Sequence, residues 1–279
     1  MRHAQPHRTT RRRVLALALS SLLAVSGACA QDVTAPAADQ SVMTRAADML
    51  YARELERARV KRSLDVDKAQ VAMARRVGSP MMAYAATFAP VAAPWSWALH
   101  VETRDEPVAY CLPGGKIMLS TGLVDRMKLT PGELAVVLAH VIAHALAGHD
   151  AATATARLAA LPFAPDPNRR ALQLADILGK IMLNDPHDKE IERETDAMAL
   201  EFMARAGVDP EPAVETWRKI ARAGGATPPG FLSLHPTWPG RIDEIEAQIA
   251  PLLPLFEQAK AEIAARPRQP PVRSRPGLN

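Results

Sequence analysis

The chain has 279 residues, of which 48% are hydrophobic, 23% are charged and only 4% are aromatic. These values are ordinary for a folded protein with a sizeable core, and they exclude wholesale disorder. The formal net charge is +4, but five arginines lie in residues 1–29 and four in residues 266–279, with no acidic residue in either segment. The part between them is therefore mildly acidic, and we expect no nucleic-acid partner.

The N-terminal segment has the pattern of an export signal. Residues 11–13 are arginines, an apolar run follows from 14 to 25, and small residues come next. The run is short for a bilayer span, and the pattern is typical of a secretory signal peptide over residues 1–29. Residues 28–30 fit cleavage after Ala30. Residues 25–29 also resemble a lipobox, which would lipidate Cys29 and attach the protein to a membrane.

The arginine run also resembles a twin-arginine signal, although a general secretory signal is favoured. On either route we expect an exported protein. It would lie in the periplasm of a bacterium, free or as a lipoprotein facing that compartment.

After this signal, residues 30–40 are polar and small and predict a linker. A helical pattern rich in Ala, Arg and Glu runs from Ser41 to about Arg76. Ser79-Pro80 is expected to break it, and a second helical piece reaches Phe88, so that residues 41–90 form an N-terminal helical part.

Short strands are predicted next, at residues 95–101, 108–112 and 116–121. The turn Pro113-Gly114-Gly115 joins the last two into a hairpin.

A helix is predicted from Pro131 to about Gly148, because Thr130 is an N-cap residue, proline suits the first position and Glu133 completes a capping box. Further helices are predicted at residues 169–183, 188–206, 211–223 and 239–249. The final segment, 266–279, contains four prolines and four arginines and is expected to be a disordered tail.

Two histidines in the helix at 131–148 are candidate metal ligands. His140 and His144 are four residues apart and share one helical face. The pair alone is weak evidence, since two hydrogen-bonded structural histidines would look the same. The helix is otherwise apolar, however, so both imidazoles would be buried and would need partners.

A later helix carries Glu192 and Asp196, which also share a face. A carboxylate can be a third zinc ligand, and a second carboxylate one turn on can orient a ligand imidazole. By itself the segment would be read as a solvated acidic face. His235 and Arg241 follow near the start of the next helix.

The order of these motifs resembles the zinc metallopeptidases of the HtpX, CaaX-prenyl-protease and BepA/LoiP type, metallopeptidase family 48. The similar stretches span residues 45–250. They are Trp95-Ser96-Trp97, residues 111–117, Thr121-Gly122-Leu123, Glu133-Leu134-Ala135, residues 140–149, residues 192–196 and His235-Pro236.

The resemblance implies an α+β, helix-dominated, zincin-like domain over residues 41–265, with a small sheet packed on the metal-binding helix. It implies one Zn²⁺ per chain and polypeptides as substrates or clients.

The resemblance also implies roles for individual residues. His140, His144 and Glu192 would bind zinc, and Asp196 would support one of these ligands. His235 and Arg241 would line and gate the active site. The strand that receives an extended peptide as a further strand would consist of Lys116, Ile117, Met118, Leu119 and Ser120.

One departure from the family motif bears on catalysis. Val141 stands where His-Glu-x-x-His places the glutamate that takes a proton from the attacking water and returns it to the leaving amine. Valine can do neither, and such a loss costs about 10²–10⁴ in rate. Zinc binding should survive, because the glutamate is not a ligand. His235 is a candidate substitute base, whereas Glu194 should point away and His149 should be structural.

Three readings remain. The favoured one is a zinc-binding peptidase-fold protein that has lost efficient proteolysis and has a peptide-binding, chaperone-like or quality-control role in the cell envelope. The second is an active metalloendopeptidase with a substitute base. The third is a lipoprotein in which zinc is only structural.

Overall fold

The computed structural model describes residues 37–223 and 230–266. The predicted signal peptide at 1–29, most of the predicted linker and the predicted tail beyond Arg266 lie outside these ranges. Helices α1 (Ala37–Val60) and α2 (Lys68–Phe88) come first, followed by the short helix η1 (Pro90–Ala92). The expected α+β, helix-dominated architecture is confirmed.

The three strands form one sheet. They are β1 (Ala98–Glu102), β2 (Ala109–Leu112) and β3 (Lys116–Ser120), in the order β1-β3-β2. Strand β3 runs parallel to β1 and antiparallel to β2, so the predicted hairpin is confirmed. Gly114 and Gly115 both have positive φ, at 87° and 76°, which glycine adopts without steric cost.

The sheet order corrects the expected peptide-binding strand. Lys116, Ile117, Met118, Leu119 and Ser120 make up β3, which is paired on both sides and has no free edge. The strand adjacent to α4 is β2, at the edge of the sheet. The hydrophobic pattern could not reveal this order, because a central strand and a buried edge strand read alike.

Helices follow the sheet to the end of the described chain. They are α3 (Thr121–Met127), α4 (Pro131–Ala147), α5 (His149–Ala159), α6 (Pro167–Asn184), α7 (Lys189–Arg205), α8 (Ala213–Ala223), α9 (Phe231–Leu234) and α10 (Arg241–Ala265). The predictions of α4, α6, α7 and α8 are confirmed within a few residues. The short helices α3, α5 and α9 were not predicted, and α10 runs through Pro251 and Pro254 well beyond the predicted end at residue 249.

The predicted break between the first two helices is in the wrong place. The chain turns at residues 61–67, where Arg62 and Asp65 have positive φ and Leu64 forms a bridge with Glu102. Asp67 then caps α2 by accepting a hydrogen bond from the Gln70 backbone N–H. Pro80 lies inside α2. A proline inside a helix removes one backbone hydrogen bond and destabilises the helix. Burial of the core-facing side of α2 offsets this loss of stability.

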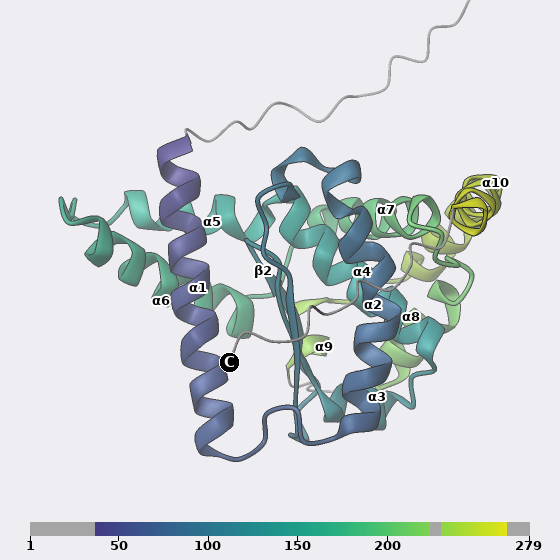
Figure 1. The fold of residues 1–279 in the computed structure, drawn as a ribbon, viewed down its shortest axis with the longest axis horizontal. Coiled ribbons are helices and arrows are strands. Elements are labelled where there is room, and N and C mark those ends of the chain that lie inside the picture. The colour runs from purple at the N-terminus through teal and green to yellow at the C-terminus, as the bar shows by residue number, and fades with distance from the viewer. Residues whose placement is uncertain (1–36, 224–229, 267–279) are drawn as a thin grey trace, which may run out of the picture. The chain divides into compact units, whose positions relative to one another are not determined.

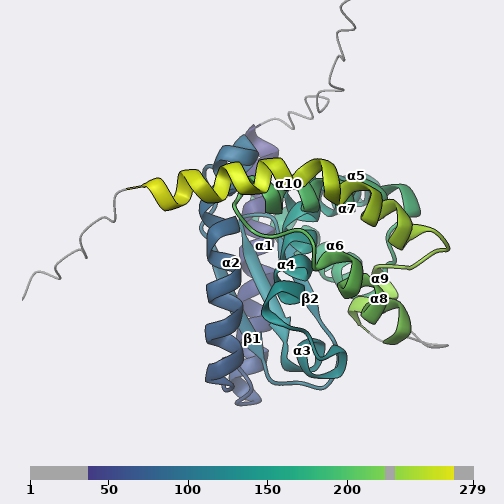
Figure 2. The same cartoon turned by 90° about the vertical axis from the view of Figure 1, so that its right-hand side faces the viewer.

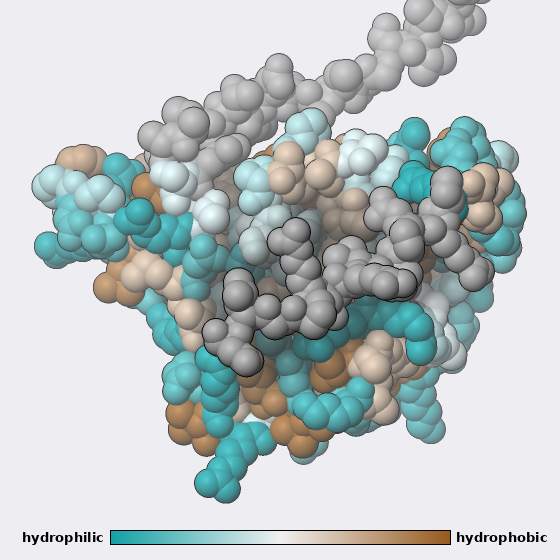
Figure 3. All heavy atoms as spheres, viewed as in Figure 1, coloured by the Kyte–Doolittle hydropathy of each residue, from teal (hydrophilic) through white to brown (hydrophobic). Residues whose placement is uncertain are grey.

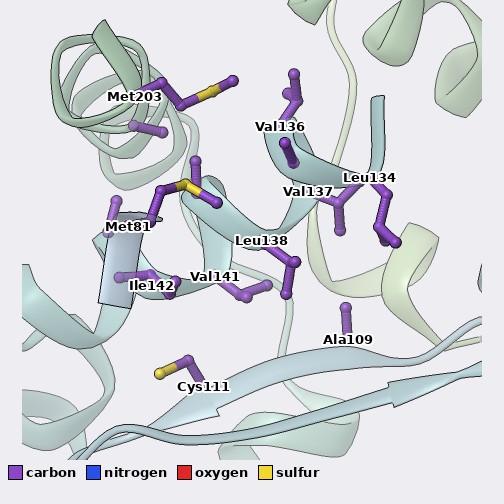
Figure 4. Close-up of a cluster of buried hydrophobic side chains, with 14 of the residues drawn as sticks. Met81, Ala109, Cys111, Leu134, Val136, Val137, Leu138, Val141, Ile142 and Met203 are labelled. Atoms are coloured by element: carbon purple, nitrogen blue, oxygen red, sulfur yellow. The ribbon is translucent and has the colours of Figure 1, made fainter. Parts of the chain in front are cut away.

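Helix α4 is the centre of the larger core cluster, and nearly all of its residues are buried. In Figure 1 the sheet is seen edge-on, with α1 and α6 on one side and α4 and α2 on the other. Figure 4 shows Leu138 and Val141 of α4 pointing toward Ala109 and Cys111 of β2. Figure 2 shows α10 alongside α7, which packs on α4.

The capping box predicted for α4 is present. Thr130 Oγ1 accepts a hydrogen bond from the Glu133 N–H at 3.3 Å, and Glu133 Oε2 accepts one from the Thr130 N–H at 2.7 Å. The helix ends at Gly148, which has φ of 76°. These two signals fix where α4 begins and ends. They therefore also fix the position of its two histidines along the sheet.

Among the described helices, no single one is long and apolar enough to span a membrane. The pair α4 and α5 meets the length and composition test together, with a bend of 43° between them, but α4 is buried in the core. On the face drawn in Figure 3, hydrophobic and hydrophilic residues are interspersed.

A partly buried ion pair joins α1 to the sheet. Glu102 at the end of β1 is 2% exposed, and both of its oxygens accept hydrogen bonds from Arg57 at 2.7 Å. Burial raises the pKa of Glu102, but Arg57 and Arg104 outweigh it and hold that pKa below its ordinary value of 4.5.

We expect Glu102→Gln to lower the free energy of unfolding by about 1–3 kcal/mol, because two charge-assisted hydrogen bonds from Arg57 are lost and only Glu54 remains as its charged partner. Urea denaturation at pH 7 measures the loss. The difference between wild type and variant should shrink as the pH falls below 4.5, because the wild-type carboxylate then takes up a proton and its advantage is lost. The exposed pair of Arg53 and Asp176 is the control, and Arg53→Ala should cost less than about 1 kcal/mol.

Candidate metal centre

The two histidines of α4 face the same point. Nε2 of His140 and Nε2 of His144 are 3.1 Å apart, and the side chains are only 1% and 3% exposed. Their spacing of one helical turn brings the rings together, and the buried surroundings of α4 exclude bulk water from both. A buried pair of imidazole nitrogens at this distance needs a shared partner.

Two more donors come from other elements. Glu192 of α7 is fully buried, and its Oε1 and Oε2 lie 3.3 and 3.5 Å from Nε2 of His144 and His140, respectively. His235, which follows α9, places Nδ1 2.8 Å from Glu192 Oε1 and 3.1 Å from His140 Nε2. The four ligand atoms all lie within 4.8 Å of one another.

This set fits zinc. Tetrahedral zinc takes imidazole nitrogen and carboxylate oxygen at about 2.0–2.2 Å, which places neighbouring ligand atoms roughly 3.3 Å apart. The five distances between donor atoms given above, 2.8–3.5 Å, bracket that value. Three nitrogens and one carboxylate are also the ligand types that suit zinc.

The carboxylates behind the centre are held by Arg241, which is completely buried. Its guanidinium donates to Glu192 Oε2 at 2.7 Å and to both oxygens of Asp196 at 2.8 and 2.9 Å. It also lies 3.6 Å above the ring of Trp217. Arg241 therefore lies behind the donors and compensates their negative charge. It does not line the mouth of the site as expected.

Asp196 lies where the sequence placed it. Its Oδ1 is 3.1 Å from Nδ1 of His140, so it faces the ring nitrogen that points away from the other donors. A carboxylate at that nitrogen fixes the orientation of the imidazole and leaves Nε2 free to bind a metal.

Burial and charge set the protonation of the donors. Burial keeps the pKa of His144 well below its ordinary value and lowers that of His235 to about 4. Both rings are therefore neutral at pH 7, the form that binds a metal. Burial opposes ionisation of Glu192, but the neighbouring His235 and His140 outweigh it and hold the pKa of Glu192 far below its usual range.

Val141 points into the space between α4 and β2. It is 2% exposed and lines a cavity of about 10 Å³ together with His144, His235 and residues of β2. That volume is close to the room of one water molecule. An apolar side chain therefore stands beside the donors at the position where the motif would place a proton acceptor.

Two other sequence expectations agree with the placement of the residues. His149 is outside the four-donor group, although its Nδ1 is 3.4 Å from Nδ1 of His144, and Glu194 points outward with a side chain 68% exposed.

One histidine beside the centre was missed. His187, just before α7, stacks on His144 with ring centroids 4.2 Å apart. Its Nε2 is 2.9 Å from Asp150 Oδ1, and its Nδ1 is 3.2 Å from Glu192 Oε1. Burial lowers its pKa, but the two carboxylates outweigh this and raise it to about 9. Since His187 lies on a connecting segment, no helical spacing linked it to His140 or His144.

The chain matches Peptidase family M48 over residues 72–249, which is more than half of its length. It belongs to that family of metallopeptidases. M48 peptidases use zinc, and the buried donor set fits that ion.

The relatives include the mitochondrial metalloendopeptidases OMA1 of three organisms. The protein of Arabidopsis thaliana is 33% identical over 150 residues, covering 51% of this chain and 29% of the relative. That of Schizosaccharomyces pombe is 34% identical over 158 residues, covering 54% and 46%. That of Saccharomyces cerevisiae is 28% identical over 180 residues, covering 58% and 50%. The chain thus spans half or less of the length of these relatives.

The expected location is corrected by these comparisons. The N-terminal pattern predicted a protein of the bacterial periplasm, whereas the similar proteins are named as mitochondrial enzymes of plants, fungi and animals. A basic, acid-free N-terminus with an apolar run is a compositional signal, and composition of that kind serves more than one targeting route.

We expect Arg241→Ala to lower the free energy of unfolding by about 3–5 kcal/mol, because it leaves two buried carboxylates without their cation. Chemical denaturation of the metal-free protein measures this loss without a contribution from zinc. Arg205→Ala, which removes an exposed pair with Glu201 at the end of α7, is the control and should have little effect. Equal losses in the two variants would contradict the role given to Arg241.

Proposed function

We propose that this M48 chain binds zinc and polypeptide segments but hydrolyses peptides poorly. The observation that carries the proposal is Val141, which is buried beside the donors and faces β2. Its place in the His-x-x-x-His motif matches that of the family's general base. The motifs described above support the HtpX, CaaX-prenyl-protease and BepA/LoiP type, and we take residues 41–265 as the peptidase-like domain.

The proposed ligands are His140, His144 and Glu192, with His235 as a fourth donor. Asp196 orients the His140 ring, and Arg241 compensates the charge of the carboxylates. When bound, zinc supplies Lewis-acid polarisation of a peptide carbonyl. Val141 cannot move a proton, and Nδ1 of His235 is already engaged with Glu192 and His140, which is why we expect slow hydrolysis.

The peptide-binding edge is proposed to be β2. Ser120 N–H donates to the Val108 carbonyl at 2.9 Å, so in an antiparallel ladder the backbone groups of Ala109 and Cys111 point away from β3. An extended peptide can add there as a further strand, close to α4 and its histidines. The cavity beside β2 is only about 10 Å³, so the segments that bear His187 and His235 must move before a peptide binds.

An active endopeptidase with a substitute base is the second candidate, and the names of the relatives favour it. A purely structural zinc is the third. Arg241 already compensates the charge of Glu192 and Asp196 in the protein alone, which argues for a site formed before the metal binds.

We expect zinc-loaded wild type to cleave casein no faster than His140→Ala, and Val141→Glu to cleave about 10²–10⁴ times faster than wild type, because glutamate restores the proton acceptor. Release of soluble peptides measures the rates. Val141→Gln is the matched control, because glutamine has nearly the same shape as glutamate but does not accept a proton. Its cleavage rate should equal that of His140→Ala.

Cleavage by the wild type above the His140→Ala level would contradict the proposal and favour a substitute base. Equal activity of Val141→Glu and Val141→Gln would show that side-chain size, and not proton transfer, limits the rate. Circular dichroism of all variants checks that the introduced polar group does not unfold α4.

A second expectation concerns removal of the metal. Chelation should leave the helical circular dichroism unchanged and lower only the melting temperature, because Arg241 and the helix packing hold the donors in place without zinc. The free energy of unfolding lost on chelation should increase with the free zinc concentration used before chelation. It is about 2.7 kcal/mol when free zinc is 100 times its dissociation constant. Unfolding on chelation at 25 °C would instead support the structural-zinc reading.

A further inference from the structure

We propose that His187 is a further ligand of this metal centre and competes with His235 for the position beside Glu192. The proposal rests on zinc binding, one part of the proposed function, and does not depend on whether proteolysis is lost. The four-donor set alone leaves His187 without a role, although the ring lies against it.

Both histidines reach the same atom. Nδ1 of His235 is 2.8 Å and Nδ1 of His187 is 3.2 Å from Oε1 of Glu192. Their ring centroids are 5.1 Å apart, and both rings lie near His144, at 5.1 and 4.2 Å. Two imidazole nitrogens of the same kind therefore approach one carboxylate oxygen from neighbouring positions.

Asp150 prepares His187 as a ligand. Asp150 is 4% exposed, and its Oδ1 lies 2.9 Å from Nε2 of the imidazole. A metal-binding histidine almost always places its second nitrogen against a carboxylate, a carbonyl or water in this way. The pair repeats the arrangement of Asp196 with His140 on the other side of the centre. A buried aspartate is costly unless it is paired, and His187 is the side chain that pairs with Asp150.

Nδ1 of His187 has a charged neighbour but no well-aligned hydrogen bond in the described part of the chain. It is buried and makes no directed hydrogen bond within the described residues, although Glu192 Oε1 is 3.2 Å away. A buried, orientated nitrogen without a hydrogen bond is rare in folded proteins. A metal ion beside Glu192 would satisfy it.

The two competing histidines are also linked through the backbone. The N–H of His187 donates to the carbonyl of Leu234 at 3.0 Å, and Leu234 immediately precedes His235. A shift of one segment therefore moves the other. With five protein donors near an ion that takes four, zinc has a protein ligand for every position, which is the coordination of closed, structural-type sites.

The test uses metal-free full-length protein titrated with Co²⁺ and then with Zn²⁺ in competition with a chromophoric chelator. We expect wild type to give the intense visible absorption of four-coordinate cobalt. His235→Ala should keep the four-coordinate spectrum because His187 takes its place, and His187→Ala should keep it because His235 holds that place. The double variant should lose the spectrum and bind zinc at least about tenfold more weakly than His235→Ala, the lower end of what even an outer partner of a ligand contributes.

His149→Ala is the matched control. It removes another histidine whose ring lies 5.5 Å from that of His144 but which is outside the donor group, so neither spectrum nor affinity should change. If His187→Ala is unfolded by circular dichroism, Asp150→Asn replaces it in both the single and the double variant. Combined with His235→Ala, Asp150→Asn should weaken zinc binding about 10–100-fold relative to His235→Ala alone.

Two outcomes overturn the inference. One is a double variant whose affinity and spectrum equal those of His235→Ala alone. The other is loss of the four-coordinate spectrum in His235→Ala alone. Failure of the wild type to bind either ion would instead overturn zinc binding itself, and with it the proposed function.

Discussion

The structure depends on one buried carboxylate. Glu192 has no exposure to water, its charge is compensated by the guanidinium of Arg241, and the imidazoles of His235 and His144 lie against its Oε1. An isolated buried carboxylate would cost many kilocalories per mole, so each partner has to be positioned by its own element. Arg241 comes from α10, Glu192 from α7 and His144 from α4. The packing of α7 between α4 and α10 is thus the packing that keeps this charge paired.

The local signals in the sequence were sufficient for the metal-binding helix and its donors. The capping box and Gly148 define α4, the spacing of its two histidines defines their common face, and the same spacing pairs Glu192 with Asp196. These rules act over one turn of helix, and for that reason they can be read without a structure.

Features that depend on long-range pairing could not be read in this way. The sequence shows three short strands but not their order. We therefore predicted β3 as the edge strand, whereas the strand at that edge is β2. A break was predicted at Pro80 and the turn at Arg62 and Asp65 was not predicted, because the burial that stabilises α2 around the proline is a tertiary effect. His187 reaches Glu192 only through the fold, and its partner Asp150 lies on a different helix.

The candidate metal centre and the edge strand β2 line the same cavity. The cavity beside Val141 is lined by β2 and also by His187 and His235. The segments of these two histidines are joined by the hydrogen bond from His187 to Leu234. In the proposed binding mode, a peptide that pairs with Ala109 and Cys111 would displace these segments and draw their imidazoles away from Glu192. The proposed peptide binding and the proposed ligation by the outer histidines would then oppose each other.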